Sequence, residues 1–105
     1  MGRTTLGVFE AELLRALMRS SRENYALVLA REVAEETGRA PPSLGAVYTA
    51  MERMQTKGFV TSYWSEPDSR RGGRRKRLYK IEADGTAALR ASAVPFRPPG
   101  LEAWA

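Results

Sequence analysis

The chain has 105 residues and a formal net charge of +5, and it contains neither cysteine nor histidine. This length accommodates one domain with a single modest core. The missing residue types exclude disulfides, the usual zinc ligand sets and histidine as a general base, so we expect no enzymatic activity, metal or cofactor. No apolar run approaches the ~18 residues of a membrane-spanning helix, and the N-terminus lacks an apolar signal segment, so we expect a cytoplasmic protein.

The first forty residues predict two helices. Apolar residues recur at helical spacing over residues 6–19, and Thr4 or Thr5 is placed to cap the start of this helix. After the polar break RSSREN, the same spacing returns from Ala26 onwards, and Gly38 occupies the position of a C-cap glycine. The sequence RAPPS then ends the second helix, because prolines disfavour helical geometry in the residue before them.

The segment SLGAVYTAMERMQTKG predicts a third helix, from Ser43 as its N-cap to Lys57, before Gly58. Its core face is expected to consist of Leu44, Val47, Met51 and Met54, with Tyr48 at the flank. The opposite face begins with small residues, so it can approach another surface closely. Its members are Gly45, Ala46, Thr49, Arg53 and Thr56, of which Thr49 and Arg53 are suited to base contacts.

After the third helix the apolar spacing changes to the period of two that is typical of strands. FVTSYWSE predicts one strand, PDSRRGG a long turn, and RRKRLYKI a second strand with Tyr79 and Ile81 on one face. Alternation also predicts that one of Tyr63 and Trp64 lies in the core while the other is exposed. The tip of this hairpin, residues 69–77, carries a charge of +6, so the rest of the chain sums to −1.

The C-terminal part predicts a short fourth helix followed by a tail. EADGTAALRAS is alanine-rich and permits a helix, although Gly85 weakens its first turn. The tail contains three prolines and a glycine, which predict irregular chain with Phe96 and Trp104 as docking points or dimer contacts. We therefore expect one folded domain over residues 1–92 and a Pro-rich tail over residues 93–105.

Three helices followed by a hairpin is the order of a winged helix-turn-helix domain, so the predicted fold class is mainly α with a β-hairpin wing. In such a domain the third helix fits the major groove of duplex DNA, and the wing places cations on the backbone or in the minor groove. A basic patch on a near-neutral body is also typical of nucleic-acid binding. Adjacent glycines at the tip would let the backbone approach DNA. The predicted DNA-binding residues are Ser43, Gly45, Ala46, Tyr48, Thr49, Arg53 and Lys57 on the helix, and Arg70, Arg71, Gly72, Gly73, Arg74, Arg75, Lys76 and Arg77 on the wing.

Four segments, LGVFEAELLRAL, AREVAEETGR, SLGAVYTAMERMQTKGFV and RRGGRRKRLYKIEADGTAAL, resemble the PadR-type (phenolic-acid-decarboxylase regulator) transcriptional regulators. The resemblance runs from about Leu6 to Leu89. It implies a bacterial, homodimeric repressor that binds double-stranded operator DNA and is released by a small-molecule effector. The family dimerises through a C-terminal helix of several turns, whereas Pro95 closely follows the predicted fourth helix here. The dimer is therefore expected either to use the first helix and the tail aromatics or to be weaker than usual.

Two other functions fit the same residues. A non-sequence-specific architectural or RNA-binding protein would use the basic hairpin without recognising bases. A winged-helix protein-interaction module would bind a partner through the third helix, although such surfaces normally have few cations at their centre. The close carboxylate pairs, Glu35 with Glu36 and Glu82 with Asp84, are interpreted as a solvated helix face and a helix start, and not as catalytic groups.

Overall fold

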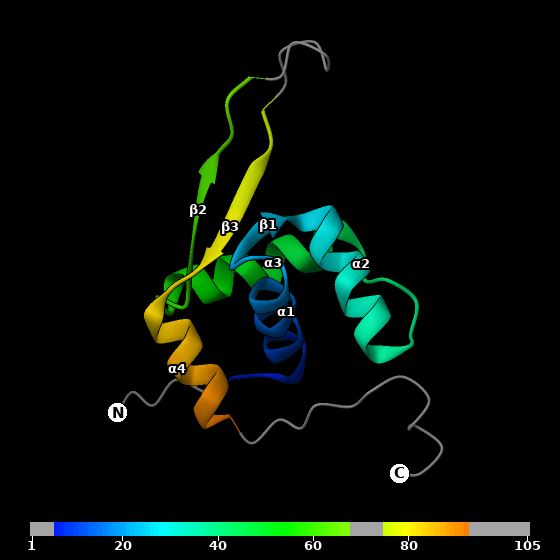
Figure 1. The fold of residues 1–105 in the computed structure, drawn as a ribbon, viewed down its shortest axis with the longest axis vertical. Helices are drawn as coiled ribbons and strands as arrows, with labels where there is room; N and C mark the ends of the chain where they lie inside the picture. The colour runs from blue at the N-terminus through cyan, green and yellow to red at the C-terminus, as the bar shows by residue number, and fades with distance from the viewer. Residues whose placement is uncertain (1–5, 68–74, 93–105) are drawn as a thin grey trace.

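The computed structural model describes residues 6–67 and 75–92 (Figure 1). The predicted order of three helices, a hairpin and a fourth helix is confirmed, and one further strand is present. Thr4, Thr5 and the tail residues Phe96 and Trp104 lie outside the described residues. The elements are α1 (Val8–Arg19), β1 (Glu23–Tyr25), α2 (Ala26–Thr37), α3 (Leu44–Thr56), β2 (Val60–Trp64), β3 (Arg77–Ile81) and α4 (Ala83–Ala91).

The helix ends follow from local capping residues. The predicted caps of the second and third helices are confirmed: Gly38 has a left-handed φ of 74°, and the Ser43 hydroxyl oxygen accepts a hydrogen bond of 3.1 Å from the Ala46 N–H. Helix α1 begins later than expected, with Gly7 at its N-cap. The Glu10 carboxylate, in the first turn of α1, accepts a hydrogen bond of 2.9 Å from the Gly7 N–H.

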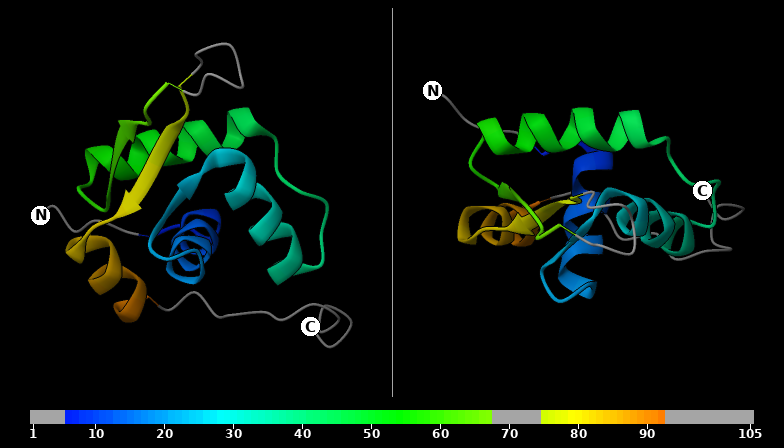
Figure 2. Two further views of the ribbon diagram at one scale, coloured as in Figure 1. Left: turned by 45° about the horizontal axis from the view of Figure 1, so that its top comes forward. Right: turned by 90° about the horizontal axis from the view of Figure 1, so that it is seen from above.

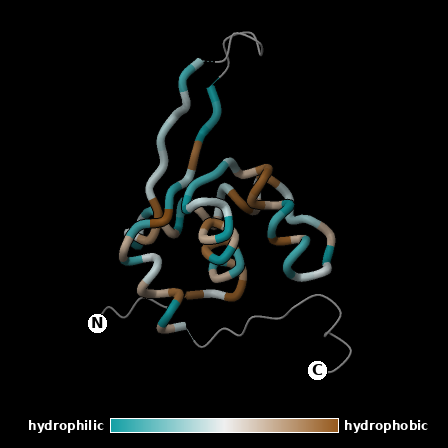
Figure 3. The backbone as a smooth tube through the Cα atoms, viewed as in Figure 1, coloured by the Kyte–Doolittle hydropathy of each residue, from teal (hydrophilic) through white to brown (hydrophobic). Residues whose placement is uncertain are grey.

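Helix α1 is the centre of the core. Figure 2 shows it surrounded by α2, α3 and the segment formed by β3 and α4, and Figure 3 shows the apolar segments concentrated in this helical body. The largest fully buried side chains come from α1, α2, α3 and the first residue of β2, and they are Leu13, Leu14, Leu17, Leu29, Val47, Met51, Met54 and Val60.

Leu44 does not belong to this core, and the prediction for it was wrong. It remains 39% exposed. Leu44 is the first residue of α3, and side chains in a helix lean toward its N-terminus, so this side chain extends beyond the part of α3 that packs on α1.

The sheet is antiparallel with the strand order β1, β3, β2. Strand β1 was not predicted, because its sequence, Glu-Asn-Tyr, is polar and shows no alternation. It forms against the free edge of β3, with Asn24 opposite Tyr79, after a turn in which Ser21 and Arg22 both have positive φ. The expected burial of Tyr79 and Ile81 on one face is confirmed.

The expectation that one of Tyr63 and Trp64 is a core residue was wrong, because both are exposed, by 45% and 58% respectively. Figure 1 shows the outer end of β2 extending past the helical body, and Tyr63 and Trp64 are the last two residues of this strand. The Tyr63 hydroxyl donates a hydrogen bond of 2.8 Å to Glu23, while Trp64 lies opposite Arg77. The outer half of the hairpin is therefore a surface feature.

Gly85 has a packing role that the sequence did not reveal. It is buried, and a Cβ atom added there would clash with the Phe59 carbonyl oxygen and lie 3.0 Å from Ile81 Cγ1. The absence of a side chain thus lets α4 lie directly against the start of β2. The preceding Glu82 does not cap α4 with its side chain, which instead accepts a hydrogen bond of 2.6 Å from the Thr61 hydroxyl.

Glu36 is buried, so the interpretation of Glu35 and Glu36 as one solvated face was wrong. The Glu36 side chain is 2% exposed, and its two oxygens accept hydrogen bonds of 2.6 Å from Arg15 Nε and from Arg19. Only Glu35 is exposed. Because Glu36 faces α1, two guanidinium groups compensate for the desolvation of its charge and tie α1 to α2.

Candidate nucleic-acid interface

One face of α3 is free of contacts with the body. Val47, Ala50, Met51 and Met54 are completely buried on the opposite face. The predicted contact residues Ser43, Gly45, Ala46 and Thr49 are all exposed, and none of them carries a charge. A Cβ atom added at Gly45 would have only the Ser43 hydroxyl oxygen near it, at 4.0 Å, so packing within the protein does not require glycine there. This end of α3 offers a small, neutral surface that a groove of DNA can approach closely.

The cations near the C-terminal end of α3 are held by α1. Lys57 Nζ lies 3.0 and 3.1 Å from the two carboxylate oxygens of Glu10, and Arg53 Nε lies 3.5 Å from one of them. The Lys57 side chain is 25% exposed and that of Arg53 55%. The main contact of Lys57 is therefore the ion pair that joins α3 to α1, whereas more of the Arg53 side chain is exposed to solvent.

These neighbours stabilise the charged form of the Glu10 carboxyl. Its burial favours the neutral form, but the Gly7 N–H and the cations of Lys57 and Arg53 outweigh the burial and hold the pKa below its usual value. Glu10 thus forms ion pairs with Lys57 and Arg53 that connect α1 to the C-terminal end of α3.

The cations of the wing differ from Lys57 and Arg53 in their ion pairing. Arg75, Lys76 and Arg77 lie at the outer part of the hairpin, and among the described residues no carboxylate forms an ion pair with them. Two hydrogen bonds between Ser65 and Lys76, of 2.7 and 2.9 Å, continue the β2–β3 pairing beyond the strands. The other predicted wing residues, Arg70, Arg71, Gly72, Gly73 and Arg74, lie outside the described residues.

Aromatic rings orient two of these cations. The Arg77 guanidinium group lies 5.6 Å from the Trp64 ring centre and 5.8 Å from that of Tyr79, and its Nε donates a hydrogen bond of 3.0 Å to Ser62. Lys76 Nζ lies 4.6 Å from the centre of the Tyr25 ring. These contacts leave the positive charge unneutralised, so it remains available to an anionic partner.

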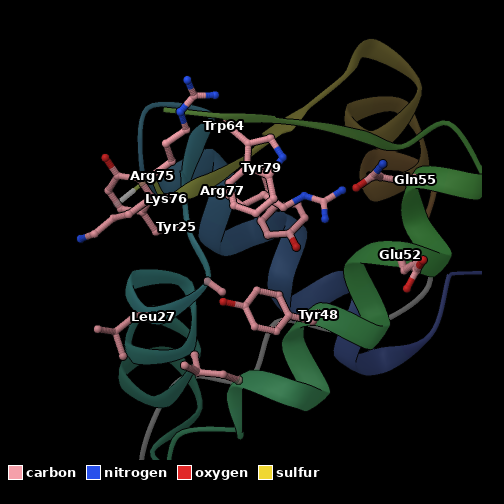
Figure 4. A pocket seen from close by; sticks show the side chains of 12 residues that line it. Tyr25, Leu27, Tyr48, Glu52, Gln55, Trp64, Arg75, Lys76, Arg77 and Tyr79 are labelled. Atoms are coloured by element: carbon pink, nitrogen blue, oxygen red, sulfur yellow. The ribbon is translucent and has the colours of Figure 1, made fainter. Parts of the chain in front are cut away.

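A cavity of about 490 Å³ separates α3 from the wing (Figure 4). Four aromatic side chains line it, and two of them, Tyr48 and Tyr79, have ring centres 6.4 Å apart. Four of the six large apolar side chains that are exposed among the described residues border this cavity. The aromatic members are Tyr25, Tyr48, Trp64 and Tyr79, and the other lining residues are Ala26, Leu27, Leu44, Glu52, Gln55, Arg75, Lys76 and Arg77.

Burial raises the pKa of Tyr79, and the charges of Tyr48 and Glu52 act in the same direction, while Arg77 opposes them. The Tyr79 hydroxyl therefore stays protonated at neutral pH and remains a hydrogen-bond donor.

Of the predicted contact residues that it describes, the structure places Tyr48, Arg75, Lys76 and Arg77 on the lining of this cavity, whereas Ser43, Gly45, Ala46, Thr49, Arg53 and Lys57 do not line it. It also adds residues that the sequence reading missed, chiefly Tyr25, Glu52 and Gln55. Tyr25 could not have been found, because strand β1 was not recognised. Glu52 could have been found, because it follows Thr49 by three residues and Gly45 by almost two helical turns, and thus lies on the same face.

Among the described residues, no helix is long and apolar enough to cross a bilayer, and no group of side chains is suited to hold a metal ion.

Comparison with known proteins identifies relatives of this architecture. The chain superimposes on a protein of Thermoplasma acidophilum described as a transcriptional regulator, with a TM-score of 0.64 and 25% identity, covering 80% of this chain and 77% of the other. A PadR family transcription regulator from Clostridium difficile gives a TM-score of 0.59 and 27% identity, covering 77% and 80% of the two chains. A PadR family transcriptional regulator from Eggerthella lenta, 19% identical, shares the fold with a TM-score of 0.61 and covers 80% and 70%.

No curated protein matches the sequence. The family model of the PadR-like transcriptional regulators, however, matches residues 13–91, from the core of α1 to the end of α4. This range includes both sides of the cavity and most of the described chain. The chain therefore belongs to the PadR-like family of transcriptional regulators, and its fold is the winged helix-turn-helix that the order of its elements predicted.

Proposed function

We propose that the protein is a sequence-specific repressor that binds double-stranded DNA as a homodimer. The observation that carries this proposal is the pairing of two surfaces across one cavity. One is the exposed face of α3, whose N-terminal half is small and uncharged, and the other is the wing, whose cations have no carboxylate partner among the described residues. Helix α3 would enter the major groove while the wing follows the neighbouring phosphates.

Helix α3 would contribute the sequence specificity of binding, and the wing would contribute affinity for the DNA backbone. Ser43, Ala46 and Thr49 are short enough to bring the axis of α3 close to the base edges, where a threonine methyl group suits thymine. The wing cations would bind phosphates and supply affinity that is independent of sequence, and each neutralised phosphate adds ~0.9 to the log–log salt slope. Arg53 and Tyr48 would contribute at the two flanks of the helix.

A two-fold dimer would present two copies of α3 to one face of the duplex. Its half-sites would then lie about one helical turn apart, ~10 base pairs, or a multiple of this distance. We place the dimer contacts in the N-terminal end of α1, where Val8 is 61% exposed, and in residues 93–105. As a regulator of this kind the protein would act in the cytoplasm and without catalysis.

We also propose that a small-molecule effector binds in the cavity between α3 and the wing. Its volume of about 490 Å³ lies in the range of ligand pockets, and its lining combines aromatic rings with cations. A planar ligand with a negative charge suits this lining. Because the effector and the duplex would contact the same side chains, each would exclude the other.

The first experiment is the selection of bound duplexes from a random DNA library at about 0.15 M salt, where non-specific affinity is weak. We expect a palindromic sequence with two-fold related half-sites. Bound DNA without any enriched sequence would instead favour an architectural or RNA-binding protein. Absence of binding to any duplex would refute the proposal and favour a protein-interaction module.

A further inference from the structure

Glu52 occupies the centre of the exposed face of α3. Gly45 lies almost two turns before it and Thr49 one turn before it, so the three residues form a row along the helix. The buried residues Met51 and Met54 point to the opposite side. Glu52 is exposed, and Figure 4 shows its carboxylate at the α3 side of the cavity.

Arg53 is less well placed than Glu52 to meet bases. It lies on the flank of α3 that faces α1, where its Nε is 3.5 Å from the Glu10 carboxylate. Tyr48 and Gln55 lie on the other flank, and the Gln55 amide oxygen accepts a hydrogen bond of 2.9 Å from Ser62 of the wing. The middle of the exposed face is therefore formed by Gly45, Thr49, Glu52 and Thr56, of which only Glu52 carries a charge.

The Glu52 carboxylate has no hydrogen-bond donor or ion-pair partner among the described residues; only its main-chain carbonyl accepts a bond, from Thr56. Three other glutamates, Glu10, Glu12 and Glu36, are buried against cations. Glu52 thus carries a free negative charge on the face that would meet a polyanion, where it repels phosphate and weakens binding unless it gains a specific partner.

The major groove offers a carboxylate one kind of favourable partner, an exocyclic amino group. Glutamate and aspartate accept a hydrogen bond from cytosine N4, whereas guanine O6 and N7 and thymine O4 are acceptors that repel a carboxylate, and adenine places its N7 acceptor beside its N6 amino group. A buried carboxylate facing such an acceptor would lose its water without compensation. Small neighbours at Gly45 and Thr49 allow the helix to come close enough for this contact.

We propose that Glu52 determines specificity by accepting a hydrogen bond from the amino group of a cytosine in the operator. This inference rests on the proposed function, since it needs α3 in the major groove. Its expected effect is a preference of roughly ten- to hundredfold for cytosine over the other bases at one position of each half-site.

The test compares Glu52→Gln with the matched control Glu35→Gln. Both remove one negative charge from an exposed helical position, but Glu35 lies on α2 and does not line the cavity. Dissociation constants are measured for the sequence selected by the wild type and for its single-base variants, at one salt concentration. Glutamine prefers adenine, so Glu52→Gln should lose the cytosine preference at one symmetric position and gain affinity for adenine there. Glu35→Gln should keep the wild-type profile.

Two results would overturn the inference while leaving the proposed function intact. In the first, Glu52→Gln binds every duplex more tightly by the same factor as Glu35→Gln and keeps the base profile, so that only general charge is involved. In the second, the position that changes is one where the wild type does not prefer cytosine. If the wild type selects no sequence at all, the proposed function fails together with the inference, and that result is seen before any variant is made.

Discussion

Replacing Gly85 with alanine should destabilise the protein, although the same change normally strengthens a helix. An added Cβ atom would clash with the Phe59 carbonyl oxygen and lie 3.1 Å from the carbonyl carbon. That carbonyl cannot turn away cheaply, because it accepts a hydrogen bond of 2.9 Å from the Glu82 N–H. Relief requires α4 to move away from β2, which disturbs the contact between α4 and the core.

The magnitude follows from two opposing contributions. Overpacking of this kind costs about 1–3 kcal/mol, whereas alanine gains about 1 kcal/mol over glycine in helix propensity. Because the clash is with a main-chain carbonyl that cannot turn away, the cost lies in the upper part of that range, about 2–3 kcal/mol, and the net loss is then about 1–2 kcal/mol. A change of 1 kcal/mol shifts the midpoint of a domain of this size by roughly 4–8 °C, so we expect Tm to fall by roughly 4–16 °C.

Thermal unfolding followed by circular dichroism would measure this shift, and Gly45→Ala is the matched control. A Cβ atom at Gly45 meets only the Ser43 hydroxyl oxygen at 4.0 Å, so this variant should be as stable as the wild type or more stable. The same substitution would thus have opposite signs at two helical positions. A Gly85→Ala variant at least as stable as the wild type would show that α4 does not pack as closely as described.

Three further results are expected. The double substitution Arg75→Ala and Lys76→Ala should weaken binding to all duplexes alike and lower the log–log salt slope by about 1.8, as titrations at several salt concentrations would show; an unchanged slope would contradict phosphate contact by the wing. Glu36→Gln should lower the free energy of unfolding in urea by about 3 kcal/mol, at the low end for a broken buried ion pair because its two guanidinium partners stay partly exposed; a loss under 1 kcal/mol would contradict its role between α1 and α2. Glu10 has a lowered pKa in the folded state, so its contribution to stability is present above its usual pKa near 4.5 and is lost as the pH falls through the folded value. Urea unfolding at pH 7 and pH 3 should therefore show a smaller acid loss for Glu10→Gln than for the wild type, and equal losses would argue against this linkage.

Local signals explain what the sequence predicted correctly. Helix spacing, the Ser43 cap and the left-handed Gly38 depend on residues close together in the chain, and so does the alternation that places Tyr79 and Ile81 on one face. The order of these elements then indicated the winged helix-turn-helix fold. The positions that were misjudged depend on distant parts of the chain.

Strand β1 illustrates this limit. Its three residues have no strand pattern of their own, and they become a strand because β3 offers an unpaired edge to them. Gly85 and Glu36 are similar cases, since the first faces the Phe59 carbonyl and the second faces two arginines of α1. The residues next to Gly85 and Glu36 in the sequence do not indicate either contact. Glu36 was therefore expected to be exposed, and Gly85 was expected only to weaken the first turn of its helix.

The candidate site was predicted in outline, but the cations were assigned too uniformly. Lys57 and Arg53 share the charge of Glu10, and the arginines of α1 neutralise Glu36, so much of the positive charge of the body is used internally. The wing cations Arg75, Lys76 and Arg77, by contrast, form no ion pair with a carboxylate of the described residues. Sequence position alone cannot separate these two groups, because the glutamate partners lie on other helices. The separation explains how a near-neutral body can carry a strongly positive wing beside the uncharged end of α3 and the carboxylate of Glu52.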